Sequence, residues 1–198
     1  MHLPGSESVG AQSSGESEPT GRSPLDAKIK RVGEMLKNKS SKSNKNILRL
    51  KLADLYWRKS LTYSEWKPAN GLARGTLDPK TSDRGVLYRD RSRKIYEYVL
   101  QRAPRTPGIE DAYLGMVLAM YERGEGRPAE RVLLRLKEVS PSCRELERGY
   151  HASVLFFVRT KKSYKANTYF RLLAETFPSS ALLPGAQMAL DAAEKKAG

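Results

Sequence analysis

The sequence has few of the side chains on which catalytic and metal sites depend. Its 198 residues include one cysteine and two histidines. A single cysteine excludes a disulfide within the chain and a metal cluster held by several thiolates. Catalysis near neutral pH needs positioned groups that titrate or attack there. We therefore expect no catalytic residue, no metal and no cofactor, and so a protein that is not an enzyme.

Long apolar runs are also missing. No stretch of 18 apolar residues occurs, and so we expect no transmembrane helix. The first 24 residues have no apolar core, and hence we expect no signal peptide. These absences favour a cytoplasmic location, with the periplasm as the alternative if a signal segment has been removed.

The histidines, the cysteine and the one short glycine motif of the chain do not form part of a recognisable catalytic or nucleotide-binding motif. His2 falls in a tail rich in Ser, Gly and Glu, and His151 falls on the surface of an expected helix. Cys143 begins a helix, whose dipole lowers the pKa of a thiol, but no histidine is close to it in the sequence. The Gly-Glu-Gly triplet at 124–126 follows a helix and has no Lys-Ser or Lys-Thr ending. We interpret it as a turn rather than a nucleotide loop.

Positive charge is abundant and unevenly placed. The formal net charge is +14. Residues 25–66 hold eleven basic and four acidic side chains, and residues 67–107 hold ten and four. Such a segment attracts phosphates, anionic lipid headgroups or acidic proteins. A merely solvated, lysine-rich surface would have the same composition.

Three prolines stand 37 residues apart, at Pro104, Pro141 and Pro178. A small residue precedes each proline by twelve positions, a large one by eight and an aliphatic one by five. The three sets are Ser92, Tyr96 and Val99; Ala129, Leu133 and Leu136; and Ala166, Phe170 and Leu173. Spacings of four and three place each set on one face of a helix, which ends before the proline. A fixed period in this range is typical of arrays of helical units.

We expect an all-α fold of seven to eight helices. Ser23 is a suitable N-cap, with Pro24 at the first helical position and Asp26 in the first turn. Ser142 and Glu145 form a capping box for a later helix. The expected helices cover about 24–37, 45–64, 85–103, 108–122, 128–139, 143–159, 163–177 and 181–195. No segment alternates with period two over its length, and so no sheet is expected.

The order of small residue, large residue, aliphatic residue and proline resembles the second helix of the tetratricopeptide repeat. Tyr113 and Tyr150 lie sixteen residues before Ala129 and Ala166, which is the family's spacing from its first helix. The period is 37 rather than the family's 34. In the first unit the second helix is displaced, although its first helix matches at Leu52, Ala53 and Tyr56. The resemblance covers about residues 46–178 and implies a right-handed solenoid of antiparallel helix pairs.

The resemblance also implies a domain organisation. Residues 1–23 form a disordered tail, because they cannot bury enough apolar surface to become ordered, and residues 24–198 form one helical-repeat domain. That domain divides into a leading helix 24–37, a divergent first repeat 45–104 with an insertion at 65–83, a second repeat 105–141, a third repeat 142–178 and a capping helix 180–197.

In this family the first helices line a concave groove that holds extended or helical peptides. The resemblance places eleven side chains in such a groove. They are Asp54, Trp57 and Arg58 from the first unit, Asp111, Leu114, Leu118 and Tyr121 from the second, and Arg148, His151, Leu155 and Arg159 from the third. Trp, Tyr and Arg are the residue types that anchor interfaces. For Leu118 and Leu155, packing against neighbouring helices is an equally good interpretation.

Two functions are consistent with these observations. The first is a non-catalytic scaffold or adaptor that holds a partner protein in the groove, within a larger assembly. The alternative is an RNA- or DNA-associated factor that uses the basic segment 25–107. A basic patch in that segment comprises Arg89, Arg91, Arg93 and Lys94. Its tyrosines Tyr88 and Tyr96 fall on the expected core face, and a stripe with few free aromatics favours an acidic protein partner over nucleic acid.

Overall fold

The computed structural model describes residues 23–38, 42–63 and 79–195, and every regular element in these ranges is an α-helix. The eight helices are α1 (Pro24–Lys37), α2 (Lys42–Leu61), α3 (Pro79–Arg102), α4 (Ile109–Glu122), α5 (Gly126–Val139), α6 (Arg144–Arg159), α7 (Ser163–Thr176) and α8 (Leu183–Glu194). The expected all-α class is thus confirmed for the described residues, which contain no strand.

Most helices begin and end within three residues of their expected bounds, and α3 is the exception. It begins at Pro79, so that residues 79–83, expected to be part of an irregular insertion, are helical. Proline at the first position favours this start, because its fixed φ suits a helix and no hydrogen-bond donor is lost there. The rest of the expected insertion, residues 64–78, and the expected tail, residues 1–22, lie outside the described residues.

One of the two predicted caps is confirmed. Ser23 caps α1, and its side-chain oxygen accepts a hydrogen bond from the backbone N–H of Asp26 at 3.4 Å. The capping box at Ser142 is wrong, because Cys143 is the N-cap of α6 and its Sγ accepts from the N–H of Leu146 at 3.3 Å. Leu146 is fully buried, and its burial fixes the register in which the first turn of α6 forms.

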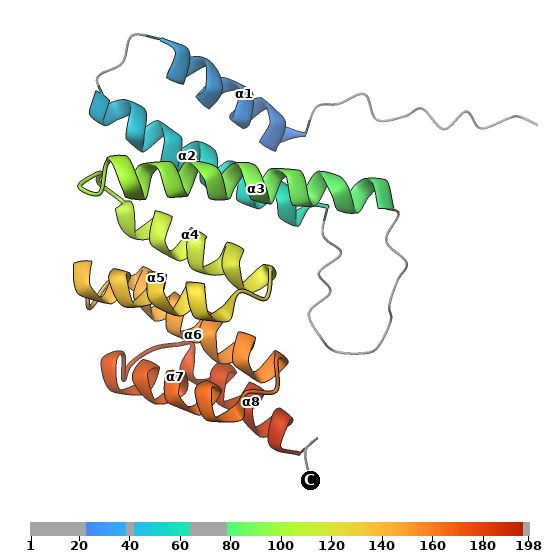
Figure 1. The fold of residues 1–198 in the computed structure, drawn as a ribbon, viewed down its shortest axis with the longest axis vertical. Helices are drawn as coiled ribbons and strands as arrows, with labels where there is room; N and C mark the ends of the chain where they lie inside the picture. The colour runs from blue at the N-terminus through green and yellow to red at the C-terminus, as the bar shows by residue number, and fades with distance from the viewer. Residues whose placement is uncertain (1–22, 39–41, 64–78, 196–198) are drawn as a thin grey trace, which may run out of the picture.

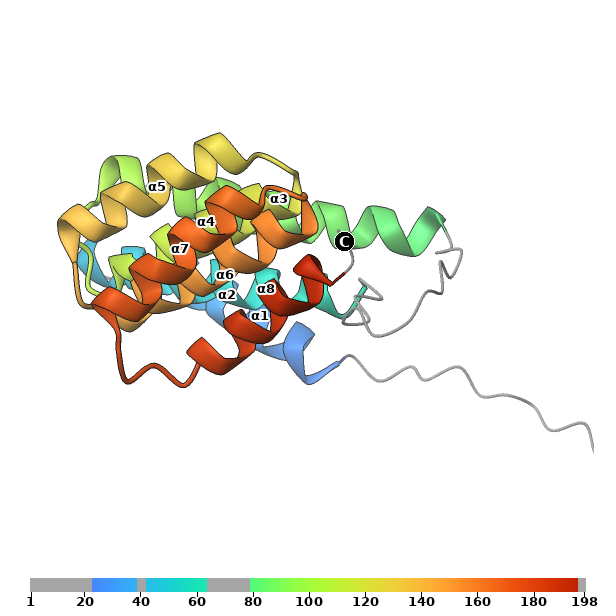
Figure 2. The ribbon, with the colours of Figure 1, turned by 90° about the horizontal axis from the view of Figure 1, so that it is seen from below.

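The helices follow one another along the long axis of the molecule, from α1 at one end to α8 at the other (Figure 1). Four of them, α2, α4, α6 and α8, form a row in which each helix contacts the next. Helices α3, α5 and α7 pack onto this row, while their backbones stay apart from one another, and α1 packs on α2. Viewed along the long axis, α5 and α7 lie on one side and α1 and α8 on the other (Figure 2). We call α2, α4 and α6 the inner row and α3, α5 and α7 the outer helices.

The 37-residue period of the sequence recurs in the backbone hydrogen bonds. The N–H groups of Ala103, Ser140 and Phe177 each donate to the carbonyl four residues earlier, all at 2.8 Å. The N–H groups of Thr106, Cys143 and Ser180 then donate to the carbonyls of these same three residues, at 3.0, 3.4 and 3.0 Å. The helices α3, α5 and α7 accordingly end two residues before Pro104, Pro141 and Pro178.

The residues of the predicted periodic face lie in the core. The small residues Ser92, Ala129 and Ala166 are fully buried, as are the aliphatic residues Val99, Leu136 and Leu173. Of the large residues, Tyr96 and Leu133 are buried. Phe170 is partly buried and packs against the hydrophobic cluster that contains Leu133. The predicted orientation of these three helices is therefore confirmed.

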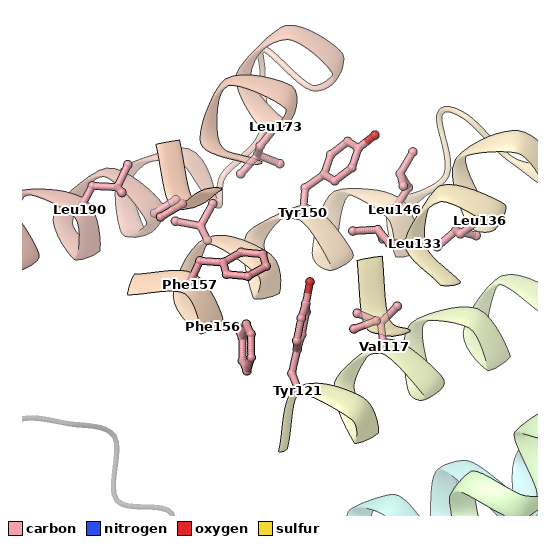
Figure 3. Packing of buried hydrophobic residues seen from close by; sticks show 14 residues of the cluster. Val117, Tyr121, Leu133, Leu136, Leu146, Tyr150, Phe156, Phe157, Leu173 and Leu190 are labelled. Carbon is pink, nitrogen blue, oxygen red and sulfur yellow. The ribbon is translucent and has the colours of Figure 1, made fainter. Parts of the chain in front are cut away.

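Two clusters make up the core. One lies between α2, α3 and α4 around Ala53, Tyr96 and Val99, and the larger one extends from α4 to α8 (Figure 3). Glycines let large side chains come close to the inner row: a Cβ on Gly115 would overlap the ring of Tyr96.

Adjacent leucines on α5 provide a test of the core. Leu133 is 1% exposed and packs in the larger cluster, whereas Leu134 is 57% exposed. Leu133→Ala is expected to lower the free energy of unfolding by about 2–5 kcal/mol, because it removes buried methyl groups and leaves a cavity. The matched variant Leu134→Ala should change it by no more than about 0.5 kcal/mol. Urea denaturation followed by circular dichroism measures both, and equal effects would contradict this packing.

Candidate partner-binding face

Three predicted groove residues come together although they lie far apart in the sequence. Asp54 on α2 and Arg148 on α6 both lie within electrostatic reach of Asp111 on α4. Partial burial raises the pKa of Asp111, the carboxylates of Glu145 and Asp54 raise this pKa further, and Arg148 lowers it. Charges of both signs therefore meet where the three helices of the inner row lie side by side.

The inner row also carries exposed arginines and one exposed leucine. Arg58 forms an ion pair with Asp54 at 2.9 Å, and both side chains are largely exposed. Leu155, on α6, is 38% exposed. Arg159 is exposed as a whole, but one of its Nη atoms donates to the backbone carbonyl of Tyr121 at 3.4 Å. These side chains can supply cationic, anionic and apolar contacts to another molecule.

The prediction that Leu114 and Tyr121 line the groove is wrong. Both side chains are buried. The hydroxyl of Tyr121 lies 2.7 Å from Oγ of Ser153, and its ring stacks on Phe156 with centroids 4.3 Å apart (Figure 3). Burial raises the pKa of Tyr121 to about 12. For Tyr121 the physical reason is that α6 packs against this side of α4 and its Ser153 and Phe156 contact the tyrosine.

Three other predicted residues are only partly accessible. Trp57, Leu118 and His151 are half-buried. His151 faces the last helix, since its Nε2 lies 3.9 Å from the position that a Cβ on Gly185 would occupy. Burial lowers the pKa of His151 below its usual value. This histidine therefore packs between α6 and α8, and the accessible face is smaller than the sequence predicted.

The predicted basic patch does not form one continuous surface. Arg89 pairs with Glu122 at 3.5 Å, and Arg93 pairs with Glu97 at 3.8 Å. Arg91 lies over the rings of Tyr56 and Tyr88, at 5.9 and 5.7 Å from their centroids. Lys94 is exposed and has no carboxylate partner among the described residues. The patch is wrong as a unit because neighbouring residues of a helix point in different directions.

The sequence analysis missed two polar contacts that join helices. Nζ of Lys59, a nearly buried side chain, lies 2.8 Å from Oδ2 of Asp26 and ties α1 to α2. Glu130 on α5 receives Lys165 and the hydroxyl of Tyr169 from α7, at 2.6 and 3.3 Å. Sequence separations of 33, 35 and 39 residues lie close to the repeat period, which is the only signal that could have suggested such partners.

Two further kinds of feature were not found among the residues that the structure describes. Within the described ranges, no three His, Cys, Asp or Glu side chains are grouped so that they could hold a metal ion. None of the helices there has both the length and the apolar character that crossing a membrane requires. Burial raises the pKa of the Cys143 thiol, although its helix-capping hydrogen bond opposes this effect.

The chain was compared with models of known protein families, with curated proteins and with solved structures. No family model, curated protein or solved structure matches it.

The buried position of His151 predicts a pH dependence of stability. Its pKa in the folded state lies below the ordinary value of 6.5. Above that pH the imidazole is neutral in both states, and the protein keeps its full stability. As the pH falls below about 6.5, the unfolded chain takes up the proton first, and the free energy of unfolding decreases. His151→Gln should remove this part of the slope in urea titrations between pH 5 and 8. An unchanged slope in this variant would contradict the assignment.

Proposed function

We propose that the protein is a non-catalytic scaffold, built as a solenoid of tetratricopeptide-like helix pairs, that holds a partner protein against its inner row. The recurrence of backbone hydrogen bonds every 37 residues supports the repeat architecture, as does the burial of the equivalent residues Ser92, Ala129 and Ala166. Stacked units of this kind present extended surfaces to which side chains from successive units contribute.

One observation carries the binding role: Asp54 on α2 and Arg148 on α6 both influence Asp111 on α4, so that charged side chains of three successive inner-row helices share one face. A structural core has no need of such a group, because charges at a packed interface are costly to desolvate. At an accessible face they instead fix the register of a partner. The exposed Leu155 and Arg159 on α6 add the apolar and arginine contacts that anchor interfaces.

The distribution of charge changes the kind of partner that we propose. Helix α4 contains Glu110, Asp111 and Glu122 and no basic residue. With Asp54 and Glu145 nearby, the middle of the inner row favours a cationic side chain of the partner. Arg58, Arg148 and Arg159 favour carboxylates at other points of the same face. A partner segment with charges of both signs therefore fits better than a uniformly acidic one.

Photo-crosslinking tests this location with two matched leucines. Replacing Leu155 on the inner row by a benzoyl-phenylalanine should yield a crosslinked partner in the native cells. The same replacement at Leu134, which is exposed on the outer helix α5, should not yield that product. Mass spectrometry of the crosslinked species identifies the partner. The same crosslink from Leu134 alone would place the binding face elsewhere.

Charge reversal provides the second arm of this test. Arg148→Glu combined with Arg159→Glu is expected to weaken capture of the crosslinked partner at least tenfold, since two interface arginines would become repulsive. Lys137→Glu combined with Arg171→Glu makes the same change in net charge on the outer helices, where both residues are exposed. Equal losses in the two variants would reject a specific role for the inner row.

A further inference from the structure

Positive charge lies on the outer helices α3 and α5 as well as on α2 of the inner row, which has six basic residues and one acidic residue. In the second helix pair, α4 has three carboxylates and no basic residue, whereas α5 carries Arg127, Arg131, Arg135 and Lys137 against two glutamates. Helix α3 has seven basic and three acidic residues. The pair formed by α4 and α5 is thus nearly neutral as a whole, but its negative charge lies on α4 and its positive charge on α5.

The repeat register places the basic residues of α3 and α5 on the same side of their helices. Lys94 and Arg131 each follow a fully buried small residue, Ser92 or Ala129, by two positions. Tyr98 and Arg135 likewise follow the buried large residues of the same two helices by two positions. Two residues correspond to a rotation of about 200° around a helix, which directs these four side chains away from the core. All four are exposed.

Most of these cations are not neutralised within the protein. Among the described residues, no carboxylate lies within ion-pair distance of Lys94, Arg127 or Arg131, while Arg135 has only an exposed contact with Glu138 at 3.4 Å. Unpaired, exposed cations on adjacent outer helices produce a local positive potential that attracts polyanions.

Exposed aromatic rings accompany the cations. Tyr98 is 46% exposed, and the guanidinium of Arg49 lies 4.8 Å from its ring centroid. Tyr164, at the start of α7, is 83% exposed and follows Lys161 and Lys162. An acidic protein or a lipid headgroup would need only the cations. Unpaired bases, in contrast, stack on exposed aromatic rings while the backbone phosphates meet the basic side chains.

We propose that the outer face formed by Lys94, Tyr98, Arg127, Arg131 and Arg135 binds single-stranded nucleic acid. The phosphates contact the cations of α3 and α5, and a base stacks on Tyr98. All five residues belong to the outer helices α3 and α5 and none of them is part of the proposed partner-binding face, and so the proposal is independent of the protein-binding role. The proposed nucleic-acid site therefore differs from the patch predicted at Arg89–Lys94, most of whose side chains make contacts within the protein. It comprises exposed residues of two outer helices instead.

Fluorescence anisotropy of the full-length protein with a labelled, mixed-sequence 20-nucleotide single-stranded RNA tests this proposal. Titrations between 50 and 200 mM salt, roughly the range over which phosphate contacts are lost, should show log K falling linearly with log salt concentration. Arg131→Gln combined with Arg135→Gln should weaken binding about tenfold and reduce the slope by about 1.4, or 0.7 for each lost phosphate contact. Lys51→Gln combined with Arg144→Gln removes the same charge from the exposed surface of α2 and α6 and should leave binding nearly unchanged.

The tyrosine separates stacking from simple charge attraction. Tyr98→Ala should weaken RNA binding at least about fivefold, whereas Tyr98→Phe, which keeps the ring, should bind as the wild type does. Far-ultraviolet circular dichroism of each variant verifies that the helices are intact.

Four results would overturn the proposal. They are no binding at 50 mM salt, roughly the low-salt limit of such contacts; equal losses in the α5 double variant and the Lys51/Arg144 control; equally tight binding of a duplex of the same length; and equally effective competition by polyglutamate or by vesicles containing anionic lipid. The last result would show a general attraction of polyanions to the surface.

Discussion

The close approach of each outer helix to the inner row depends on one small side chain per unit. Ser92, Ala129 and Ala166 are all fully buried at the same position of their helices. In the first unit the hydroxyl of Ser92 also donates to the backbone carbonyl of Ala53 at 2.8 Å, which shows how closely α3 and α2 approach. Interiors are packed too densely for a larger side chain to enter such a site without moving the helices apart. The orientation of every outer helix, and hence of its exposed residues, follows from this contact.

The turns that follow the outer helices fix where the next helix begins. The N–H groups of Thr106, Cys143 and Ser180 donate to carbonyls three residues earlier, and the proline in each turn cannot continue the preceding helix. Because the same bonds recur at the same period, successive inner helices start from equivalent positions. This regularity brings Asp54, Asp111 and Arg148 together across three helices, although no two of them are neighbours in the sequence.

The sequence was sufficient to predict the helices and their buried faces, because both depend on local spacing and on turn residues. It was insufficient where one helix covers another. Leu114 and Tyr121 were expected to be accessible, but both are buried, and the side chains that cover Tyr121 come from α6. The members of the predicted basic patch differ in their surroundings for a related reason. Arg89 faces Glu122, Arg91 faces two tyrosine rings, and Lys94 faces solvent. The spacing of residues along a helix predicts the direction in which a side chain points from that helix. It does not predict which residue of another helix the side chain faces.

Helix α8 is polar at the positions where α6 is apolar, although its Met188 is 71% exposed. Equivalent positions, one period apart, hold Tyr150, Val154 and Phe157 in α6 and Gln187, Asp191 and Glu194 in α8. The three α6 residues are buried, and the rings of Tyr150 and Phe157 lie against Tyr169 of α7. The three α8 residues are exposed, and Gln187 donates to Asp191 at 2.7 Å on the helix surface. Helix α8 therefore packs through Ala186 and Leu190 on one side and is polar where an outer helix would otherwise be needed. A polar surface at these three positions needs no further helix to cover it, because an uncovered apolar face there would favour association with other chains.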